Sequence, residues 1–258
     1  MDYTKINAET WDRWAENGFT WTQPISHEDY LAVTADNFIV YLTPCVPVPH
    51  EWFGGSQDNG LSGKRLLGLA SGGGQQMPVF AKLGADCTVF DNSERQLASE
   101  AMVAEREGYK IEILRGDMTK PLPFADATFD IIFHPVSNCY IEDVQHVWNE
   151  CYRILKPGGV LLAGMDNGMN FLFAEDEAPL VVVNRLPFNP LKMPKEQVAQ
   201  MLANDDGIQF SHTLEEQIGG QLKAGFILRA LYEDRDRPGC GVIREYCPQY
   251  FATLAVKG

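Results

Sequence analysis

The feature that most constrains the fold is a regular alternation of short apolar runs and amphipathic segments between residues 65 and 165. Five apolar runs predict strands, at 65–69, 87–90, 111–114, 129–133 and 160–165. Three segments between them predict helices, at 75–83, 93–107 and 142–155. Such a series requires a mostly parallel sheet with helices on both faces, so the sequence predicts an α/β domain.

The remaining segments divide into those that extend the sheet and those that stand outside it. A helix at 212–223 and strands at 226–233 and 250–256 are predicted to complete the sheet. Residues 1–60 contain two helical patterns, at 8–17 and 27–42, and residues 167–210 form an irregular, proline-containing insert. We therefore predict a helical cap at 1–60 and a main domain at 61–258. Because ligands of open α/β sheets bind beyond the carboxyl ends of the strands, the cap and the insert are expected to cover that crevice.

Composition narrows the range of partners. A formal net charge of −14 argues against a nucleic-acid surface, so the predicted partner is a small molecule. No apolar run approaches the ~20 residues of a membrane helix, and the first residues lack the pattern of a secretory signal. Six cysteines occur without a C-x-x-C pair, which indicates neither a zinc site nor a disulfide framework. We expect a cytoplasmic protein with no metal site.

A glycine-rich turn follows the first predicted strand and reads Ala70-Ser71-Gly72-Gly73-Gly74. Glycine allows a ligand to approach the backbone, and a helix that follows such a turn offers unpaired N–H groups. The turn lacks the Lys-Ser/Thr pair of a phosphate-binding loop. It also lacks the third glycine of the G-x-G-x-x-G pattern, which leaves a nicotinamide-dependent oxidoreductase only as an alternative function.

Polar residues follow the next three strands as well. Asp91 lies 17 residues after Gly74, close to the spacing at which a second-strand carboxylate binds ribose hydroxyls. Asp117 is suited to accept a hydrogen bond from the exocyclic amine of adenine, and the thioether of Met118 is suited to pack on the ring. His134 ends the fourth strand. All of these residues are expected to line one crevice.

Four segments in series resemble the class I S-adenosylmethionine-dependent methyltransferases, of the type 11-like group. They are "LLGLASGGG", "VFDNSERQL", "GDMTKPLPFADATFDIIF" and "YRILKPGGVLLAGM". The resemblance implies a Rossmann-like, seven-stranded, mostly parallel sheet whose last strand is antiparallel. It implies S-adenosylmethionine as cofactor and methyl transfer to a small-molecule acceptor. The expected cofactor-binding residues are Ala70, Ser71, Gly72, Gly74, Asp91, Asn92, Gln96, Gly116, Asp117, Met118 and His134.

One departure from this family stands in the first motif. The family usually has an acid two residues before a first glycine, where this chain has Gly68 and Ala70. The cofactor's amino group is therefore expected to bind differently, through backbone carbonyls near Ala70 or in the loop after strand four. The altered motif also leaves a non-catalytic S-adenosylmethionine-binding module as an alternative.

Candidate catalytic and substrate residues lie near these strand ends and in the cap. A base would help with a hydroxyl, thiol or protonated amine acceptor, and the candidates are His134, Tyr140 and His27. The predicted substrate contacts are Trp21, Tyr30, Asn138 and Tyr140, whereas Trp11 and Trp14 fall on one helical face and are expected to pack. The sequence "HPVSNCY" also lacks the Asn/Asp-Pro-Pro-Tyr/Phe order of similar enzymes that methylate bases, which argues against a DNA substrate.

Overall fold

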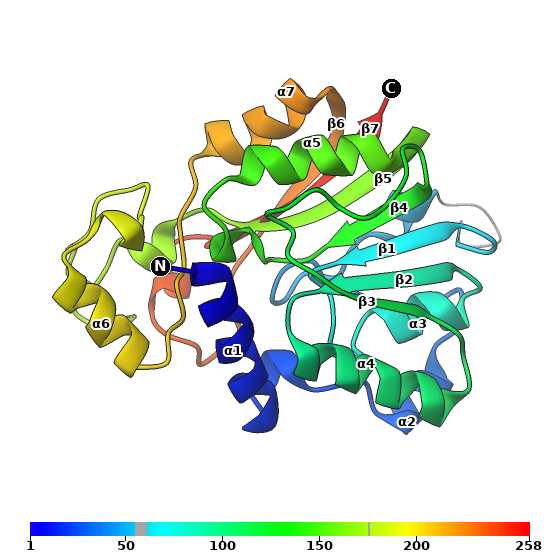
Figure 1. The fold of residues 1–258 in the computed structure, drawn as a ribbon, viewed down its shortest axis with the longest axis horizontal. Helices are drawn as coiled ribbons and strands as arrows, with labels where there is room; N and C mark the ends of the chain where they lie inside the picture. The colour runs from blue at the N-terminus through cyan, green and yellow to red at the C-terminus, as the bar shows by residue number, and fades with distance from the viewer. Residues whose placement is uncertain (55–60, 175) are drawn as a thin grey trace.

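The computed structural model describes residues 1–54, 61–174 and 176–258, and it contains a seven-stranded sheet (Figure 1). The strands are β1 (Arg65–Leu69), β2 (Asp86–Asp91), β3 (Glu112–Arg115), β4 (Phe129–His134), β5 (Leu155–Asp166), β6 (Phe226–Asp234) and β7 (Tyr250–Lys257). Their order is β3-β2-β1-β4-β5-β7-β6, and β7 runs antiparallel to β5 and β6. This confirms the predicted fold. The predicted domain boundary at residue 60 falls in 55–60, outside the described residues.

Helices cover both faces of the sheet (Figure 1). They are α1 (Tyr3–Glu16), α2 (His27–Ala32), α3 (Met77–Lys82), α4 (Glu94–Glu107), α5 (Val144–Ile154), α6 (Lys195–Ala203) and α7 (Gly220–Ala224). Three-residue or four-residue 3₁₀ turns lie at Thr20–Thr22, His50–Phe53, Asn138–Tyr140, Met169–Phe171, Pro190–Lys192 and Ile243–Glu245, and a π-helical turn at Glu215–Gly219 precedes α7.

Two hydrophobic cores lie on opposite faces of the sheet, because alternate strand residues point to opposite sides. In β1, Leu67 and Leu69 pack in the core that contains the fully buried Trp148 of α5. Leu66 packs in the other core, with Phe80 of α3 and the segment 38–53. The sheet thus keeps its carboxyl-end edge free for residues from the loops.

The second predicted helix of the cap, at 27–42, is wrong beyond Ala32, where α2 ends. The side chain of Asn37 closes a turn there: its Oδ1 accepts a hydrogen bond from the Thr34 N–H (2.7 Å), and its Nδ2 donates to the Ala32 carbonyl (3.1 Å). The residues that follow are extended, so burial alternates along them. The buried members are Phe38, Val40 and Leu42.

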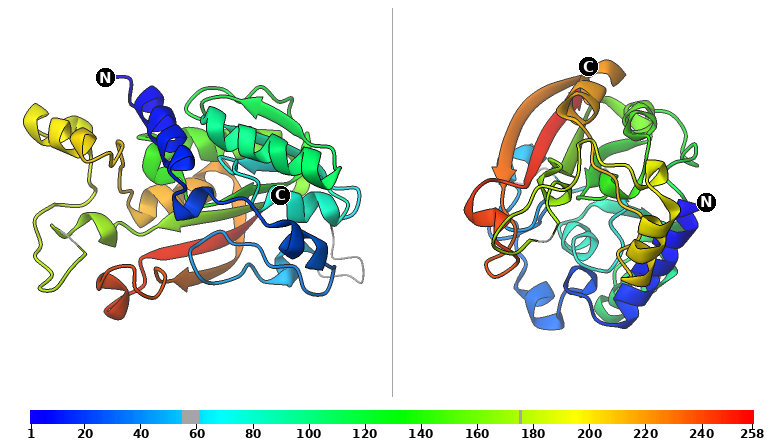
Figure 2. Two further views of the ribbon diagram at one scale, coloured as in Figure 1. Left: turned by 90° about the horizontal axis from the view of Figure 1, so that it is seen from below. Right: turned by 90° about the vertical axis from the view of Figure 1, so that its left-hand side faces the viewer.

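The insert is less irregular than predicted, because it contains α6. Val198 of α6 is buried with Ile208 and Phe210, and Tyr3 and Ile6 of α1 pack against this group. In both views of Figure 2, α6 (yellow) lies on the same side of the molecule as α1 (blue). α6 shows little amphipathic pattern in the sequence because Val198 is its single buried residue.

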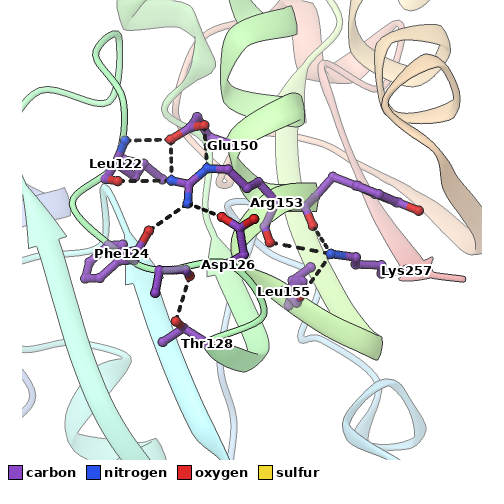
Figure 3. Close-up of polar contacts among 10 residues, drawn as sticks. Leu122, Phe124, Asp126, Thr128, Glu150, Arg153, Leu155 and Lys257 are labelled. Carbon is purple, nitrogen blue, oxygen red and sulfur yellow. Dashed lines mark hydrogen bonds and ion pairs between the residues drawn. The ribbon is translucent and has the colours of Figure 1, made fainter.

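Arg153 of α5 joins two of the segments that resemble methyltransferases, at the edge where β4 and β5 begin (Figure 3). Its guanidinium binds two carbonyls and two carboxylates, those of Leu122 (3.0 Å), Phe124 (2.7 Å), Asp126 (2.9 Å) and Glu150 (2.7 Å). Beside it, Lys257 of β7 donates to the carbonyl of Leu155 (2.8 Å). These contacts lie at the edge opposite the carboxyl ends of the strands, so these residues hold the sheet together and do not face a ligand.

Candidate active site

A cavity of about 710 Å³ lies at the carboxyl ends of the strands, where the order reverses between β1 and β4. Its size falls within the range of about 300–1,000 Å³ that small-molecule sites occupy. Residues of the cap, the insert and the β6–β7 connection complete its walls, among them Trp21, Phe171 and Arg237. The cap and the insert thus both contribute residues to the crevice.

The N–H groups of the glycine turn form hydrogen bonds within the chain. The Gly72 N–H donates to Oδ2 of Asp91 (3.0 Å), and the Gly73 N–H donates to the Gln96 carbonyl (2.9 Å). The Gly74 N–H donates to the buried carboxyl of Glu100 (2.9 Å). The chain itself therefore takes up all three N–H groups and ties the turn to β2 and α4.

Gly72 and Gly74 are glycines for different structural reasons. A Cβ on Gly72 would lie 3.1 Å from Asp91 Oδ2, beside the cavity that Gly72 lines. A Cβ on Gly74 would lie 2.7 Å from a methyl group of Val103, and Gly74 does not line the cavity. Gly74 is therefore required by packing against α4.

Gly68 and Ala70, the two departures in the first motif, differ in their surroundings. A Cβ on Gly68 would lie 2.4 Å from the sulfur of Met77, which is fully buried. The Met77 thioether therefore fills the space that a side chain at 68 would enter. Ala70 has a φ of +50°, in the left-handed region that favours glycine, and it lines the cavity.

The predicted nucleoside end of the cavity contains most of the expected residues. Asp91 lines it, and each of its oxygens accepts one backbone N–H, from Gly72 (3.0 Å) and Ser93 (2.9 Å), which leaves a lone pair on each. Burial raises the pKa of Asp91, and the backbone N–H groups of Ser93, Gly72 and Asn92 oppose the rise. Asp91 is therefore held in a fixed orientation with spare acceptor capacity toward the cavity.

Apolar and polar groups for an adenine lie next to Asp91. Phe90 and Met118 line the cavity, and Gly116 is a glycine because a Cβ there would lie 2.2 Å from the Phe90 ring. Asp117 lines it too, and one of its carboxylate oxygens accepts from the Thr119 N–H (2.8 Å). The further expected residues that line the cavity are Ser71, Asn92 and Gln96.

His134 and Asn138 do not line the cavity, although both were predicted for the site. Nδ1 of His134 lies 2.9 Å from the Leu69 carbonyl, and Nε2 lies 2.9 Å from Oδ1 of Asn138. The amide nitrogen of Asn138 donates in turn to Gln217 (2.9 Å). Burial lowers the pKa of His134, and the contacts with Leu69 and Asn138 oppose this shift. This buried chain joins β1, β4 and the segment before α7.

The aromatic residues are distributed differently from the prediction. Trp21 and Tyr140 line the cavity as expected. Trp11, which was expected to pack, lines it too, and its ring centre lies 5.5 Å from that of Tyr140. Tyr30 lies outside the lining and is held by the Lys82 ammonium, 4.8 Å from its ring centre. His27 is exposed and pairs with Glu107 (2.9 Å). Tyr30 and His27 are not brought to the cavity.

Asp166, at the end of β5, was missed by the sequence analysis. It lines the cavity and is 3% exposed. Its Oδ1 accepts from the Gly168 N–H (2.9 Å), whereas Oδ2 has no hydrogen-bond partner among the described residues. Burial raises the pKa of Asp166 to about 7. The available signal was its place directly after the fifth apolar run, at the same sheet edge as Asp91.

The surroundings of Asp166 are phenolic and thiol groups. Burial, with a smaller contribution from Asp166, raises the pKa values of Tyr140 and Cys139 well above their usual ranges. Tyr250 pairs with Asp166 across β5 and β7, and burial also raises the pKa of its hydroxyl. All three groups stay protonated near pH 7. Tyr140 is therefore suited to donate a hydrogen bond rather than to act as a base.

Asn7 of α1 ties three segments together at the cavity wall. Its amide nitrogen donates to the carbonyls of Tyr140 (3.1 Å) and Ile208 (2.9 Å), and its Oδ1 accepts from the Ile208 N–H (2.7 Å). The cap, the loop after β4 and the insert thus meet at one buried side chain.

Comparisons with known proteins agree with this geometry. A family described as "Methyltransferase domain" matches residues 67–163. The protein described as "Uncharacterized methyltransferase YbaJ", from Bacillus subtilis (strain 168), is 40% identical over 255 residues, which cover 97% of this chain and 97% of that protein. The chain belongs to the class I S-adenosylmethionine-dependent methyltransferases. Its cofactor is S-adenosylmethionine.

Two further comparisons show how far the likeness extends along the methyltransferase. The "Ubiquinone/menaquinone biosynthesis C-methyltransferase UbiE" of Cereibacter sphaeroides (strain ATCC 17029 / ATH 2.4.9) is 33% identical over 159 residues, 57% of each chain. The crystal structure of an S-adenosylmethionine-dependent methyltransferase from Mesorhizobium loti shares the fold, with a TM-score of 0.60 and 19% identity over 81% of this chain and 98% of that one. Within the described residues, no helix is both long and apolar enough to cross a membrane.

Proposed function

We propose that this methyltransferase transfers a methyl group to a small-molecule acceptor (EC 2.1.1.-). The observation that carries the proposal is a cavity whose lining differs chemically along the sheet edge. Asp91, Asp117 and Met118 follow β2 and β3, whereas Tyr140 follows β4 and Asp166 and Tyr250 belong to β5 and β7 on the other side of the switch point. A cavity walled by the cap and the insert favours a small acceptor over a macromolecule. The name of the UbiE relative, which refers to quinone biosynthesis, is in keeping with this choice.

The cavity residues fit the cofactor on two grounds. Asp91 keeps spare acceptor capacity for a ribose diol, and Gly72 lines the cavity with no side chain, beside Asp91. We propose that nine expected residues bind the cofactor and that Gly74 and His134 do not. The nine are Ala70, Ser71, Gly72, Asp91, Asn92, Gln96, Gly116, Asp117 and Met118.

When bound, S-adenosylmethionine supplies a methyl group on a sulfonium, which is open to in-line displacement by a nucleophile. The chain contributes orientation and the exclusion of water, through Trp11, Trp21 and Phe171 around the cavity. Asp166 supports a further role, because a carboxyl with a pKa of about 7 is suited to accept the proton of a hydroxyl or amine acceptor. Tyr140 is suited to orient that acceptor as a hydrogen-bond donor.

We propose that the enzyme works in the cytoplasm, as a cap at 1–60 on a catalytic domain at 61–258. All six cysteines are free thiols, which suits a reducing compartment. The cap contributes Trp11 and Trp21 to the cavity wall, so the division describes two parts of one site.

Two measurements test the proposal. Calorimetry should show that the purified protein binds S-adenosylhomocysteine and does not bind NADH. Incubation with methyl-labelled S-adenosylmethionine and the small-molecule fraction of a cell extract should then label at least one metabolite, whereas Gly72→Val, which places a branched side chain in the cavity wall, should not. A folded protein that binds the cofactor product but labels no metabolite would support a non-catalytic binding module instead.

A further inference from the structure

Arg237 stands out among the residues that line the cavity. It lies in the connection between β6 and β7, and it is the single basic side chain among the described lining residues. The acidic lining residues are Asp91, Asp117 and Asp166. An anionic group inside the cavity is therefore repelled by each of these carboxylates when they are ionised and attracted by Arg237 alone.

The guanidinium of Arg237 is held in place by an aromatic ring. Its central carbon lies 3.9 Å from the centre of the Trp21 ring, which also lines the cavity. The backbone carbonyl of Trp21 accepts a hydrogen bond from the side chain of Gln75 (2.6 Å), directly after the glycine turn. This contact ties the main chain of Trp21 to the segment after the glycine turn, and the Trp21 ring stacks on the guanidinium.

The described residues give this guanidinium no carboxylate within ion-pair distance. Oδ1 of Asp236 accepts from the backbone N–H of Arg237 (2.7 Å). Asp236 thus fixes the main chain of Arg237, and the planar donors of the side chain stay available. A rigid guanidinium with open donors matches the two oxygens of a carboxylate.

We propose that Arg237, stacked on Trp21, binds a carboxylate group of a ligand inside the cavity. The proposal rests on the proposed function. Two ligands can bring that carboxylate, the methionine part of the cofactor or the methyl acceptor. In either case the site selects for a negative charge in a protein whose net charge of −14 otherwise repels it.

The experiment is calorimetric and needs no knowledge of the acceptor. Arg237→Met keeps an apolar chain on Trp21 but removes the charge, and Arg237→Lys keeps the charge but removes the planar pair of donors. Arg235→Met is the matched control, because Arg235 is exposed, does not line the cavity and donates to the backbone carbonyl of Arg244. Each variant is titrated with S-adenosylhomocysteine and with 5′-methylthioadenosine, which has the same nucleoside thioether but no carboxylate.

If Arg237 binds the cofactor, Arg237→Met should weaken S-adenosylhomocysteine binding about tenfold or more and leave 5′-methylthioadenosine binding within about twofold. Arg237→Lys should lie between this variant and the wild type. If S-adenosylhomocysteine binding is unchanged, benzoate is titrated into the protein saturated with that ligand. Binding to the wild type and not to Arg237→Met assigns the site to an acceptor carboxylate.

The proposal is overturned if Arg237→Met changes neither S-adenosylhomocysteine binding nor benzoate binding, or if it weakens 5′-methylthioadenosine equally. Failure of the proposed function looks different, because the folded wild-type protein would then bind no S-adenosylhomocysteine at all.

Discussion

Replacing Asp166 with asparagine removes a buried ionisable carboxyl and keeps the size and shape of the side chain. In the folded protein, burial raises the pKa of this carboxyl to about 7. An exposed aspartate in the unfolded chain has a pKa of about 3.9. Between these two values the folded state holds a proton that the unfolded chain has released. The free energy of unfolding therefore falls as the pH rises through this window, and the loss is complete above the folded pKa.

The size of the effect follows from the width of the window. Each pH unit within it corresponds to about 1.4 kcal/mol, so the wild-type protein should lose roughly 2–3 kcal/mol at this carboxyl between about pH 5 and pH 8. Asparagine does not titrate. The free energy of unfolding of Asp166→Asn, relative to wild type, should therefore rise by the same roughly 2–3 kcal/mol across that range, since the other groups titrate in both proteins.

The assay is urea denaturation of both proteins at several pH values, followed by tryptophan fluorescence. Asp86→Asn is the control, because the Asp86 side chain is 76% exposed, and its difference from wild type should stay nearly constant with pH. A constant difference for Asp166→Asn as well would refute the reasoning, because the carboxyl would then not be neutral at pH 5–7. Asp166→Asn should also lose methyl transfer, because a buried carboxyl that destabilises the folded protein is expected to be kept for its function.

Three further predictions concern other parts of the site. Asp91→Ala should weaken S-adenosylhomocysteine binding in calorimetry by about 10²–10⁴-fold, because two charge-assisted bonds of about 1.5–3 kcal/mol each are lost. Asp12→Asn is the control, because Asp12 lies beside the start of α4 and outside the cavity lining, and it should change the affinity little. An equal loss of affinity in both variants would show that Asp91 does not bind the cofactor. Burial raises the pKa of Glu100 to about 7, so Glu100→Gln should gain roughly 2–3 kcal/mol of unfolding free energy relative to wild type between about pH 5 and pH 8; a pH-independent difference would contradict this. Gly68→Ala should lower the free energy of unfolding by about 1–3 kcal/mol through overpacking against Met77, and the double variant with Met77→Ala should lose less than the sum of the single losses; additive losses would show that the two residues do not compete for one space.

The residues at the first three strand ends could be predicted because apolar runs mark where parallel strands stop. Asp91, Asp117 and Met118 follow such runs, and all three line the cavity. Their position depends on the strand alone, which the alternation of apolar residues determines. The prediction of the fold succeeded for the same reason.

His134 shows where the strand pattern stops being sufficient. A strand end fixes the position of the backbone but not the neighbours of its side chain, and His134 is enclosed by Leu69 and Asn138. Outside the strands, Trp11 of the cap lines the cavity although it was expected to pack, and Tyr30 packs against Lys82 although it was expected to contact the substrate. Their surroundings depend on contacts with distant residues, such as Tyr140 and Lys82, that no local pattern records.

The hydrogen bonds of the Asn7 side chain have a consequence for engineering the acceptor preference of such an enzyme. The matched methyltransferase family spans residues 67–163, whereas Asn7 joins residues 140 and 208 across the cavity wall. Asn7 and Ile208 both lie outside that span, so the family match covers the first strand ends but not this part of the cavity wall. On the proposed function, we expect that an exchange of acceptor preference requires the segments before and after the span to be transplanted together, with Asn7 and Ile208 kept as a pair.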